Sequence, residues 1–305
     1  MNKIDLSIIV ASYNTRDLLY GCLKSIFENT SKNISFEVIV IDDCSPDDSV
    51  KMVKDFFPEV RIVVNSSNLR YAKTNNHGLS IAKGRYGLLL NSDVIVYPNA
   101  FFGLVKFMDE HSDVAAAGPK LINSDGSIQH CIRGFPGLLP MIFQSLNMHK
   151  IFPGNRFTEK YYNTKFDYSK SQPVESIGTT AFIIRRSTWE KYGMLDERFS
   201  LALVDLAYCL MLKNNNEEVW YFANSTVMHY GSQTVNMNGK KEIQLLHKAI
   251  RDFYKYYYKN QHSFVTQRII YVLIWFRQLL KQLEFKLKRN KQVFGGVGVK
   301  SKKEN

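Results

Sequence analysis

The chain has 305 residues and a formal net charge of +12 at pH 7, which first suggests a negatively charged partner such as nucleic acid or an anionic membrane. Residues 240–305 hold 16 lysines and arginines against 4 acidic residues, so the first 239 residues are neutral. With 45% hydrophobic and 22% charged residues, the composition excludes an intrinsically disordered chain. The length allows one large domain with an appendage, or two domains.

The cysteines and the apolar runs narrow the class further. Four scattered cysteines without a CxxC pair favour a reducing compartment and argue against a structural zinc site. The amino terminus lacks the apolar core and cleavage site of a signal peptide. The longest apolar run of the tail, 269–276, is far shorter than the roughly 20 residues of a transmembrane helix, so we expect no single-helix span.

Strands and helices alternate over the first hundred residues. Short apolar runs between polar residues predict buried strands, and apolar residues three and four positions apart predict helices. The expected order is strand 6–11, a helix with its apolar face at 18–26, strand 36–41, a helix that buries Val50, Val53 and Phe56 or Phe57 and ends at Pro58, strand 61–64, helix 71–82 and strand 86–90. This alternation predicts a parallel sheet covered by helices on both faces.

Each of the four strands is followed by polar residues. They are Ser12, Tyr13 and Asn14, then Asp42 and Asp43, then Asn68, then Asn91, Ser92 and Asp93. Any one of them is explained as a turn or helix-capping residue. Four strand ends in succession favour a ligand site, because carboxylates gathered at one sheet edge repel each other unless a cation or a hydrogen-bond donor lies among them. Neither GxGxxG nor GxxxxGK[ST] occurs, so dinucleotide and P-loop sites lose their main support.

These blocks carry a resemblance to a known family. IIVASYN, VIVIDDCSPDDS, NLRYAKTNNHG, LLLNSDVIV, GPKLINSDGSIQ, RGFP, GTTAFIIRRSTWEKYGMLDERF and VMHYGSQT follow one another in the chain. They resemble the successive blocks of the family-2 inverting glycosyltransferases, particularly the rhamnosyltransferase-like branch. The resemblance implies a GT-A fold, a mostly parallel Rossmann-like α/β sheet, over 1–235, with the nucleotide-sugar half at about 1–97 and the acceptor half at about 98–235.

The resemblance also implies the donor site. Asp42 matches the aspartate that binds the nucleotide base, and Ser12 and Asn14 lie where the first loop contacts base and ribose. The last aspartate of a DxD-like motif holds a divalent cation, Mg²⁺ or Mn²⁺, which offsets the charge of the leaving diphosphate. The remaining matched positions are Asn68 and Asn76 beside the nucleotide, Asn91 and Asp93 in the DxD-like motif, and His229 as the second metal ligand.

The acceptor side departs from the family pattern. Asp205 falls at the position of the general base, but Val204 replaces the preceding Glu and Ala207 replaces a second Asp. One interpretation keeps Asp205 as the base, because an acidic residue in an apolar segment is costly unless it is used. The other takes 201–212 as a core helix of a catalytically weak or inactive sugar-nucleotide-binding subunit. Arg70 stands where the family usually has Gly, so it either accepts a strained backbone angle or marks a changed loop.

The tail, 236–305, is expected to be a basic helical region whose last 11 residues are disordered. From Arg268 onward, apolar residues recur every three or four positions, with Trp275 and Ile274 widening the apolar face and Arg277 and Lys281 mostly on the other side. Such a helix is typical of a membrane interface, and the alternative is packing on the protein's own domain. The aperiodic, aromatic stretch 149–172 is expected to form a loop over the site. Tyrosines of this stretch, such as Tyr161 and Tyr162, are candidates for contacts with the acceptor.

Weighed together, these features predict an inverting glycosyltransferase of cell-surface polysaccharide assembly. Its partners would be a nucleoside-diphosphate sugar and a lipid-linked saccharide acceptor. Rhamnose on deoxythymidine diphosphate is the first expectation for the donor, followed by other hexoses on uridine diphosphate. The tail would hold it at the anionic inner face of the plasma membrane, in the cytoplasm. A nucleic-acid-binding protein would explain only the tail, since no binding motif is present, so no nucleic acid partner is expected.

Overall fold

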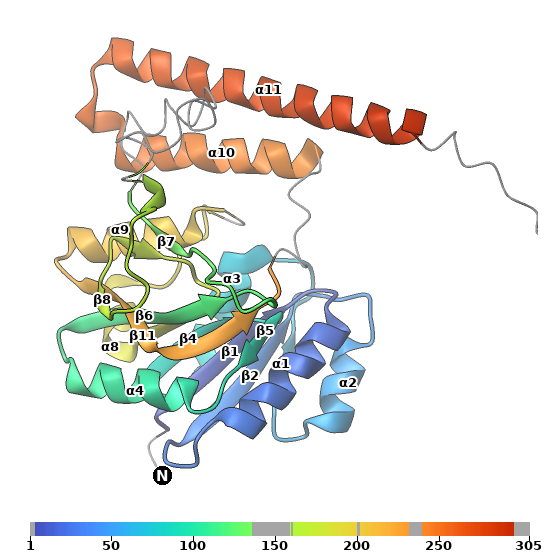
Figure 1. The fold of residues 1–305 in the computed structure, drawn as a ribbon, viewed down its shortest axis with the longest axis vertical. Helices are drawn as coiled ribbons and strands as arrows, with labels where there is room; N and C mark the ends of the chain where they lie inside the picture. Colours follow the sequence, from blue (N-terminus) through green and yellow to red (C-terminus); the bar gives the residue numbers. More distant parts are fainter. Residues whose placement is uncertain (1–3, 136–158, 160, 200–201, 232–239, 296–305) are drawn as a thin grey trace, which may run out of the picture.

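A mixed sheet of nine strands forms the centre of the molecule (Figure 1). The structure is a computed structural model that describes residues 4–135, 159, 161–199, 202–231 and 240–295. The strand order is β3-β2-β1-β4-β10-β6-β11-β5, and β8 pairs with β11. The bounds of these strands are β1 Leu6–Ser12, β2 Phe36–Asp42, β3 Arg61–Val64, β4 Tyr86–Asn91, β5 Val94–Val96, β6 Val114–Ile122, β8 Gln172–Pro173, β10 Ala181–Arg185 and β11 Glu218–His229. A separate pair joins β7 (Ile132–Arg133) to β9 (Ser176–Ile177).

The predicted parallel sheet is confirmed for the four strands that were expected from the sequence. β3, β2, β1 and β4 are parallel neighbours. Beyond β4 the sheet is mixed, because β10 runs antiparallel to both β4 and β6, while β11 is parallel to β6 and antiparallel to β5 and β8. The parallel half therefore brings several strand ends to one edge, and the mixed half brings β11 back to that edge.

Helices cover both faces of the sheet. They are α1 Arg16–Asn29, α2 Ser49–Phe56, α3 Arg70–Ile81, α4 Ala100–Glu110, α8 Arg186–Tyr192 and α9 Val204–Asn214. Two further helices, α10 Lys240–Tyr257 and α11 Phe264–Gly295, belong to the tail. The three helices expected from the sequence are confirmed. In and after α2, Val53 and Phe57 are buried and Phe56 is 60% exposed, while Val50, expected in the core, is only partly buried because Met52 takes the inward position.

Two cores follow from the alternation of side chains along each strand. Ile8, Val10 and similar residues pack against α1, α2 and α4. Ile9 and Leu89 pack on the other face, against α3, α8 and α9. Each large side chain that is fully buried contributes about 1.5–3 kcal/mol, so these two cores hold the strand ends in fixed positions.

The tail forms a helical hairpin of α10 and α11 above the sheet domain (Figure 1). α10 packs on the domain, with the Phe253 ring 5.8 Å from that of Phe199 and the Tyr257 hydroxyl donating to Asp196 Oδ2 at 3.3 Å. α11 packs on α10 through Ile270 and Ile274. α10 therefore packs on the protein's own domain, which was the alternative expected for the tail.

The structure corrects two expectations about α11. Ile274, expected on the membrane-facing side, is 2% exposed because it packs against Tyr254 of α10. Arg277 and Lys281, expected on an outer cationic face, share a helix face with Ile274, because residues three, four and seven positions apart align. Within the described part of the chain, no helix is long and apolar enough to cross a membrane. The final residues, 296–305, and part of the expected loop 149–172, namely 149–158 and 160, lie outside the described residues.

Candidate active site

The carboxyl ends of β1, β2 and β4 meet at one edge of the sheet. Ser12 at the end of β1 pairs with Asp42 at the end of β2, and Ala11 pairs with Asn91 at the end of β4. The polar residues that follow the three strands in sequence are therefore brought together in space. This is the edge at which open α/β sheets bind their ligands.

A chain of buried hydroxyls links the loops at this edge. Thr15 Oγ1 lies 3.0 Å from Ser12 Oγ and 2.9 Å from Ser92 Oγ, and all three residues are buried. Because each hydroxyl both donates and accepts, the three satisfy one another without engaging the neighbouring carboxylates. The loops after β1 and β4 are thus held in register, and the carboxylates stay free of these donors.

The two adjacent aspartates after β2 have different surroundings. Asp43 accepts hydrogen bonds from the backbone N–H groups of Leu69 and Arg70, both at 2.8 Å, and from the Asn65 amide at 2.9 Å. These bonds fix the start of α3. Asp42 is fully buried, and its Oδ2 accepts the Ser45 N–H at 2.9 Å, while its Oδ1 has no hydrogen-bond partner among the described residues. An unpartnered buried acceptor costs about 1–3 kcal/mol, so Asp42 is the one of the two that is suited to a ligand.

Asp93 and His229 meet because β5 lies antiparallel to the end of β11. His229 is opposite Val94 in the pairing, and the N–H of Tyr230 donates to the backbone oxygen of Asp93 at 3.1 Å. His229 Nε2 consequently lies 3.2 Å from Asp93 Oδ1. The Asp93 carboxylate is 1% exposed, and neither of its oxygens has a hydrogen-bond partner of acceptable geometry in the described residues.

The orientation of His229 is set by Gln129. His229 Nδ1 lies 2.7 Å from Gln129 Oε1, an atom that only accepts, so the proton is on Nδ1. In a neutral imidazole, Nε2 then presents a lone pair to a carboxylate oxygen. Two such lone pairs repel unless a proton or a metal cation lies between them. This orienting contact is the kind that histidine metal ligands make with their second nitrogen.

The residues present at this point fit one hard cation. Asp93 supplies two unpartnered carboxylate oxygens and His229 an imidazole nitrogen. The described residues contain no cluster of three or more His, Cys, Asp or Glu suited to a metal. Mg²⁺ usually keeps several waters and takes only one or two protein carboxylates together with substrate phosphates, so two protein ligands suffice for a cation that binds with its substrate.

The predicted asparagines fall in different places. Asn14 is exposed with a left-handed φ of 54°, and its N–H donates to Ser45 Oγ at 2.9 Å, while Asn68 is exposed in the loop before α3. Asn76 is buried in α3 and does not join the sheet edge group. Its amide donates to the backbone oxygen of Leu195 and to Glu197, and its oxygen accepts the Leu195 N–H. The Asn76 side chain is therefore occupied in holding the turn at 195–197 to α3.

Asp205 lies in the first turn of α9, partly buried. Its Oδ1 accepts the N–H of Leu206 at 2.9 Å. Burial raises the pKa of the Asp205 carboxyl above its ordinary value, and the Leu206 N–H and the positive charge of Arg133 act in the opposite direction. A carboxylate with a raised pKa is a stronger base than an ordinary aspartate.

Tyr71 connects the electrostatics of Asp205 and Asp93. Its hydroxyl donates to the backbone oxygen of Thr179 at 2.8 Å. Burial raises the pKa of Tyr71, and the negative charges of Asp205 and Asp93 raise it further. The carboxylate at the sheet edge and the one on α9 therefore act on the same phenol, as expected if donor and acceptor meet between them.

Four residues that shape this site were not predicted from the sequence. Thr15 follows the block IIVASYN and Tyr71 lies within NLRYAKTNNHG, but neither belongs to the polar strand ends, and their contacts reveal them. Gln129 and Arg133 stand in the blocks GPKLINSDGSIQ and RGFP, so the motif positions were a signal that could have identified them. Their partners, His229 and Asp205, are far away in the sequence.

Comparison with known proteins places the chain in a class. A sequence model of Glycosyl transferase family 2 matches residues 7–192, which is more than half of the chain. The match to this family model and the polar edge of the sheet both indicate a sugar transferase. The chain belongs to glycosyl transferase family 2, and the predicted family is confirmed.

Relatives and solved structures agree with this membership. N-acetylglucosaminyl-diphospho-decaprenol L-rhamnosyltransferase of Mycobacterium tuberculosis is 21% identical over 255 residues, 80% of this chain and 82% of that protein. Glycosyltransferase GlyG of Streptococcus pneumoniae is 31% identical over 42% of this chain and 44% of its own. The Staphylococcus aureus TarS fragment 1–349 has a TM-score of 0.55 at 16% identity, covering 84% of this chain and 74% of its own.

A more distant structure matches at least as closely in shape. GalNAc-T7 with UDP, GalNAc and Mn²⁺ has a TM-score of 0.62 at 13% identity and covers 85% of this chain, which spans 49% of that chain's length. At such identities the likeness concerns the fold. The predicted GT-A fold is confirmed.

Arg70 adopts the left-handed backbone that its position usually assigns to glycine. Its φ is 72°, and the N–H of the same residue is held by Asp43 at 2.8 Å. A side chain in this region costs roughly 1–2 kcal/mol. Of the two expectations for position 70, a strained backbone angle or a changed loop, the structure shows the strained backbone angle.

We therefore predict an inverted order of stability at position 70. Arg70→Gly should unfold in urea with a free energy about 1 kcal/mol higher than Arg70→Ala, because glycine relieves the strain that alanine keeps. At an ordinary helical position glycine is less stable than alanine by a similar amount. Equal stabilities, or a more stable alanine variant, would show that the backbone at 70 is not strained.

Proposed function

We propose that this protein transfers a sugar from a nucleoside-diphosphate sugar to a hydroxyl of a lipid-linked saccharide in cell-surface polysaccharide synthesis. Rhamnose is the first candidate for that sugar. The observation that carries the proposal is the buried Asp93 carboxylate, unpartnered among the described residues and facing His229 at the sheet edge. Support comes from family membership and from a relative whose name is that of a rhamnosyltransferase acting on a lipid diphosphate.

The donor would lie along the ends of β1, β2 and β4. Asp42, with one oxygen free of described partners, is proposed to accept a hydrogen bond from the nucleotide base. Ser12 and Asn14 would contact base and ribose from the first loop. We leave Asn76 out of this set because its amide is already occupied. The proposed donor residues are Ser12, Asn14, Asp42, Asn68, Asn91 and Asp93.

Asp93 and His229 are proposed to hold Mg²⁺ or Mn²⁺ with the donor diphosphate. A bound divalent cation offsets the negative charge that develops on the leaving nucleoside diphosphate. Asp93 positions that charge at the sheet edge, and Gln129 keeps the His229 ring turned toward it. The structural neighbour GalNAc-T7, whose structure contains UDP and Mn²⁺, supports the proposal by its fold.

Asp205 is proposed as the general base. It would take the proton of the acceptor hydroxyl while that oxygen forms a bond to the anomeric carbon of the donor sugar. The bond between this carbon and the diphosphate oxygen breaks on the opposite face, so the configuration inverts and the nucleoside diphosphate leaves. The raised pKa of the Asp205 carboxyl favours proton uptake in this step.

The donor site is tested by nucleoside diphosphate release from a panel of deoxythymidine and uridine diphosphate sugars with Mg²⁺ or Mn²⁺. Asp93→Asn should lower the rate by roughly 100-fold or more, because charge stabilisation by the cation is worth several kcal/mol. The matched control is Asp113→Asn, an exposed aspartate before β6, which should leave the rate unchanged. Full activity in Asp93→Asn would remove the metal site from the proposal.

The pH dependence of transfer tests Asp205. A base works only when deprotonated, so kcat/KM should rise with pH through the pKa of Asp205 and have its acidic midpoint above the ordinary aspartate value of about 4. Arg133→Gln removes a charge that lowers this pKa, and the midpoint should move to higher pH. Asp205→Asn should reduce transfer by about 100-fold or more while donor binding persists.

Two results would contradict this assignment. Unchanged transfer in Asp205→Asn would remove Asp205 as the base. If the unaltered chain binds the donor but transfers its sugar to no lipid-linked saccharide acceptor, the result would favour the catalytically inactive subunit. That is the alternative raised by Val204 and Ala207.

We propose that α11 places the enzyme at the anionic inner face of the plasma membrane. Its outer face carries a stripe of exposed apolar side chains, among them Val265, Ile269, Val272 and Trp275, each more than half exposed. Two basic residues of the same helix, Arg268 and Lys286, also have exposed side chains. An apolar stripe accompanied by cations is complementary to an interface of acyl chains and anionic headgroups.

Vesicle flotation tests this placement. Trp275→Ser should reduce binding to vesicles of phosphatidylcholine with phosphatidylglycerol by roughly tenfold, since burying a large apolar side chain is worth about 1.5–3 kcal/mol. Phe56→Ser is the matched control, because Phe56 is equally exposed but lies on α2 of the sheet domain. Equal binding of all three chains would exclude α11 as the membrane-facing surface.

A further inference from the structure

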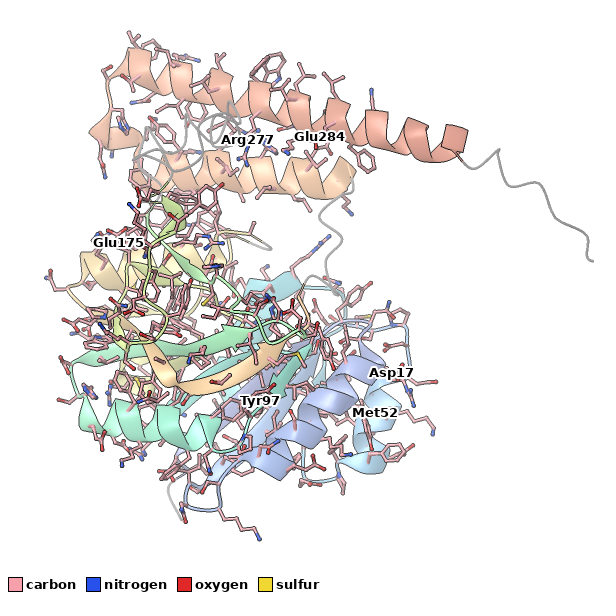
Figure 2. All side chains as sticks on the ribbon, in the orientation of Figure 1. Asp17, Met52, Tyr97, Glu175, Arg277 and Glu284 are labelled. Carbon is pink, nitrogen blue, oxygen red and sulfur yellow. The ribbon has the colours of Figure 1, made fainter. Side chains whose placement is uncertain are left out.

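A cluster of basic side chains lies inside the helical hairpin, between α10 and α11. We call His247 and Arg251 of α10, with Arg277 and Lys281 of α11, the hairpin cation cluster. Toward the turn, the same two helix faces pack through Tyr254, Ile270 and Ile274. Figure 2 labels Arg277 on α11 above α10. The interior of the hairpin is therefore apolar at one end and cationic further along.

The cluster is only partly satisfied by its own contacts. Arg251 Nη1 donates to Gln278 Oε1 at 2.9 Å, and Lys281 Nζ pairs with Glu284 Oε2 at 2.9 Å. The Nε of Arg277 is buried and has no hydrogen-bond partner among the described residues. His247 is 1% exposed and donates from Nδ1 to the backbone oxygen of Ile243 at 2.7 Å, which leaves its buried Nε2 without a described partner.

Only part of the charge of the cluster is balanced by carboxylates. Lys281 pairs with Glu284, whereas no ion pair joins His247, Arg251 or Arg277 to a carboxylate among the side chains that the structure describes. Burial lowers the pKa of His247 to about 4, with further lowering by the charges of Arg277, Arg251 and Lys281. Burial also lowers the pKa of Arg277. A buried cation without a counter-charge costs several kcal/mol, and an anionic ligand would offset that cost.

The cluster is electrostatically continuous with the acceptor side. Arg277 lowers the pKa of Tyr161, which burial and the negative charge of Asp205 raise to about 12. The guanidinium of Arg133, which acts on Asp205, lies 5.7 Å from the ring centre of Tyr162. The charges of Asp205 and Arg277 therefore act in opposite directions on the same phenol.

We propose that the hairpin cation cluster binds a phosphate group carried by a lipid, with Arg277 and Arg251 as its main contacts. Guanidinium groups suit phosphate oxygens because they offer paired N–H donors, and two of them match the charge of a phosphate group. The exposed apolar stripe of the same helix would set the cluster near the level of lipid phosphates. The inference deepens the proposed function, on which it rests for the acceptor as the source of the phosphate.

The first experiment measures binding of inorganic diphosphate to the full chain by calorimetry, in EDTA and without donor. We expect binding that Arg277→Gln weakens by roughly tenfold or more, that Arg277→Lys weakens less, and that Asp93→Ala leaves unchanged. Arg268→Gln, an exposed arginine of the same helix, is the matched control and should bind as the unaltered chain does. No binding, or equal binding by Arg277→Gln, would overturn the proposal.

Thermal unfolding separates a ligand site from a packing role. Without anion, Arg277→Gln should melt at a higher temperature than the unaltered chain, because it removes a buried cation that lacks a described partner. Diphosphate should raise the melting temperature of the unaltered chain and not that of Arg277→Gln. A lower melting temperature for Arg277→Gln, with the same response to diphosphate as the unaltered chain, would show that Arg277 only packs and overturn the proposal.

The source of the phosphate is decided with vesicles. Phosphatidylcholine vesicles are prepared with a polyprenyl diphosphate or with phosphatidic acid, at matched anionic charge. Arg277-dependent flotation with the polyprenyl diphosphate alone supports the acceptor carrier, and Arg277-dependent flotation with both supports bilayer phosphates. Flotation independent of Arg277 in both cases overturns the site. Because no arm needs donor or metal, these results are independent of whether the proposed sugar transfer succeeds.

Discussion

The site at the sheet edge is built around a buried carboxylate that has no hydrogen-bond partner among the described residues. Asp93 is 1% exposed, and the hydroxyl of the preceding residue, Ser92, bonds to Thr15 instead. Desolvating a charged group without a partner costs several kcal/mol, which the two apolar cores on either side of the sheet offset. Asp43 at the same edge is the contrast, since three donors satisfy it and it serves the start of α3. Asp43 is thus committed to the fold, whereas Asp93 is the carboxylate for which we propose a charged ligand.

The long strand β11 completes the site from the far end of the sequence. It runs parallel to β6 from Glu218 to Met228, with a register shift between Phe222 and Thr226, and its last residues also pair antiparallel with β5 on the other side. The pairing with β5 brings His229 to Asp93, and Gln129 fixes which ring nitrogen faces the carboxylate. The mixed half of the sheet is therefore what brings His229 to the edge formed by the ends of the parallel strands.

The basic tail turns out to have two different faces. Its outer side is an apolar stripe, while Arg277 and Lys281 turn inward toward α10 with His247 and Arg251. The net charge of the chain is therefore not a uniform coating for a negative surface. Part of it is placed inside a hairpin, where the charge of Arg277 lowers the pKa of Tyr161 and where we propose a local phosphate ligand.

Much of the fold and part of the site were predictable from the sequence. Periodicity determined the four parallel strands and the helices between them, and the motif blocks determined the family and the choice of Asp42, Asp93 and His229 as candidates. Local patterns could not separate Asp42 from Asp43, or show that the Asn76 amide is already occupied, since the deciding donors come from segments far away in the chain. The inward direction of Arg277 also depends on which side of α11 meets α10. The sequence by itself therefore determined which residues reach the sheet edge, because strand and helix periods are local properties. Only the tertiary structure decided which of them stay unpartnered, because hydrogen bonding and burial are set by distant neighbours.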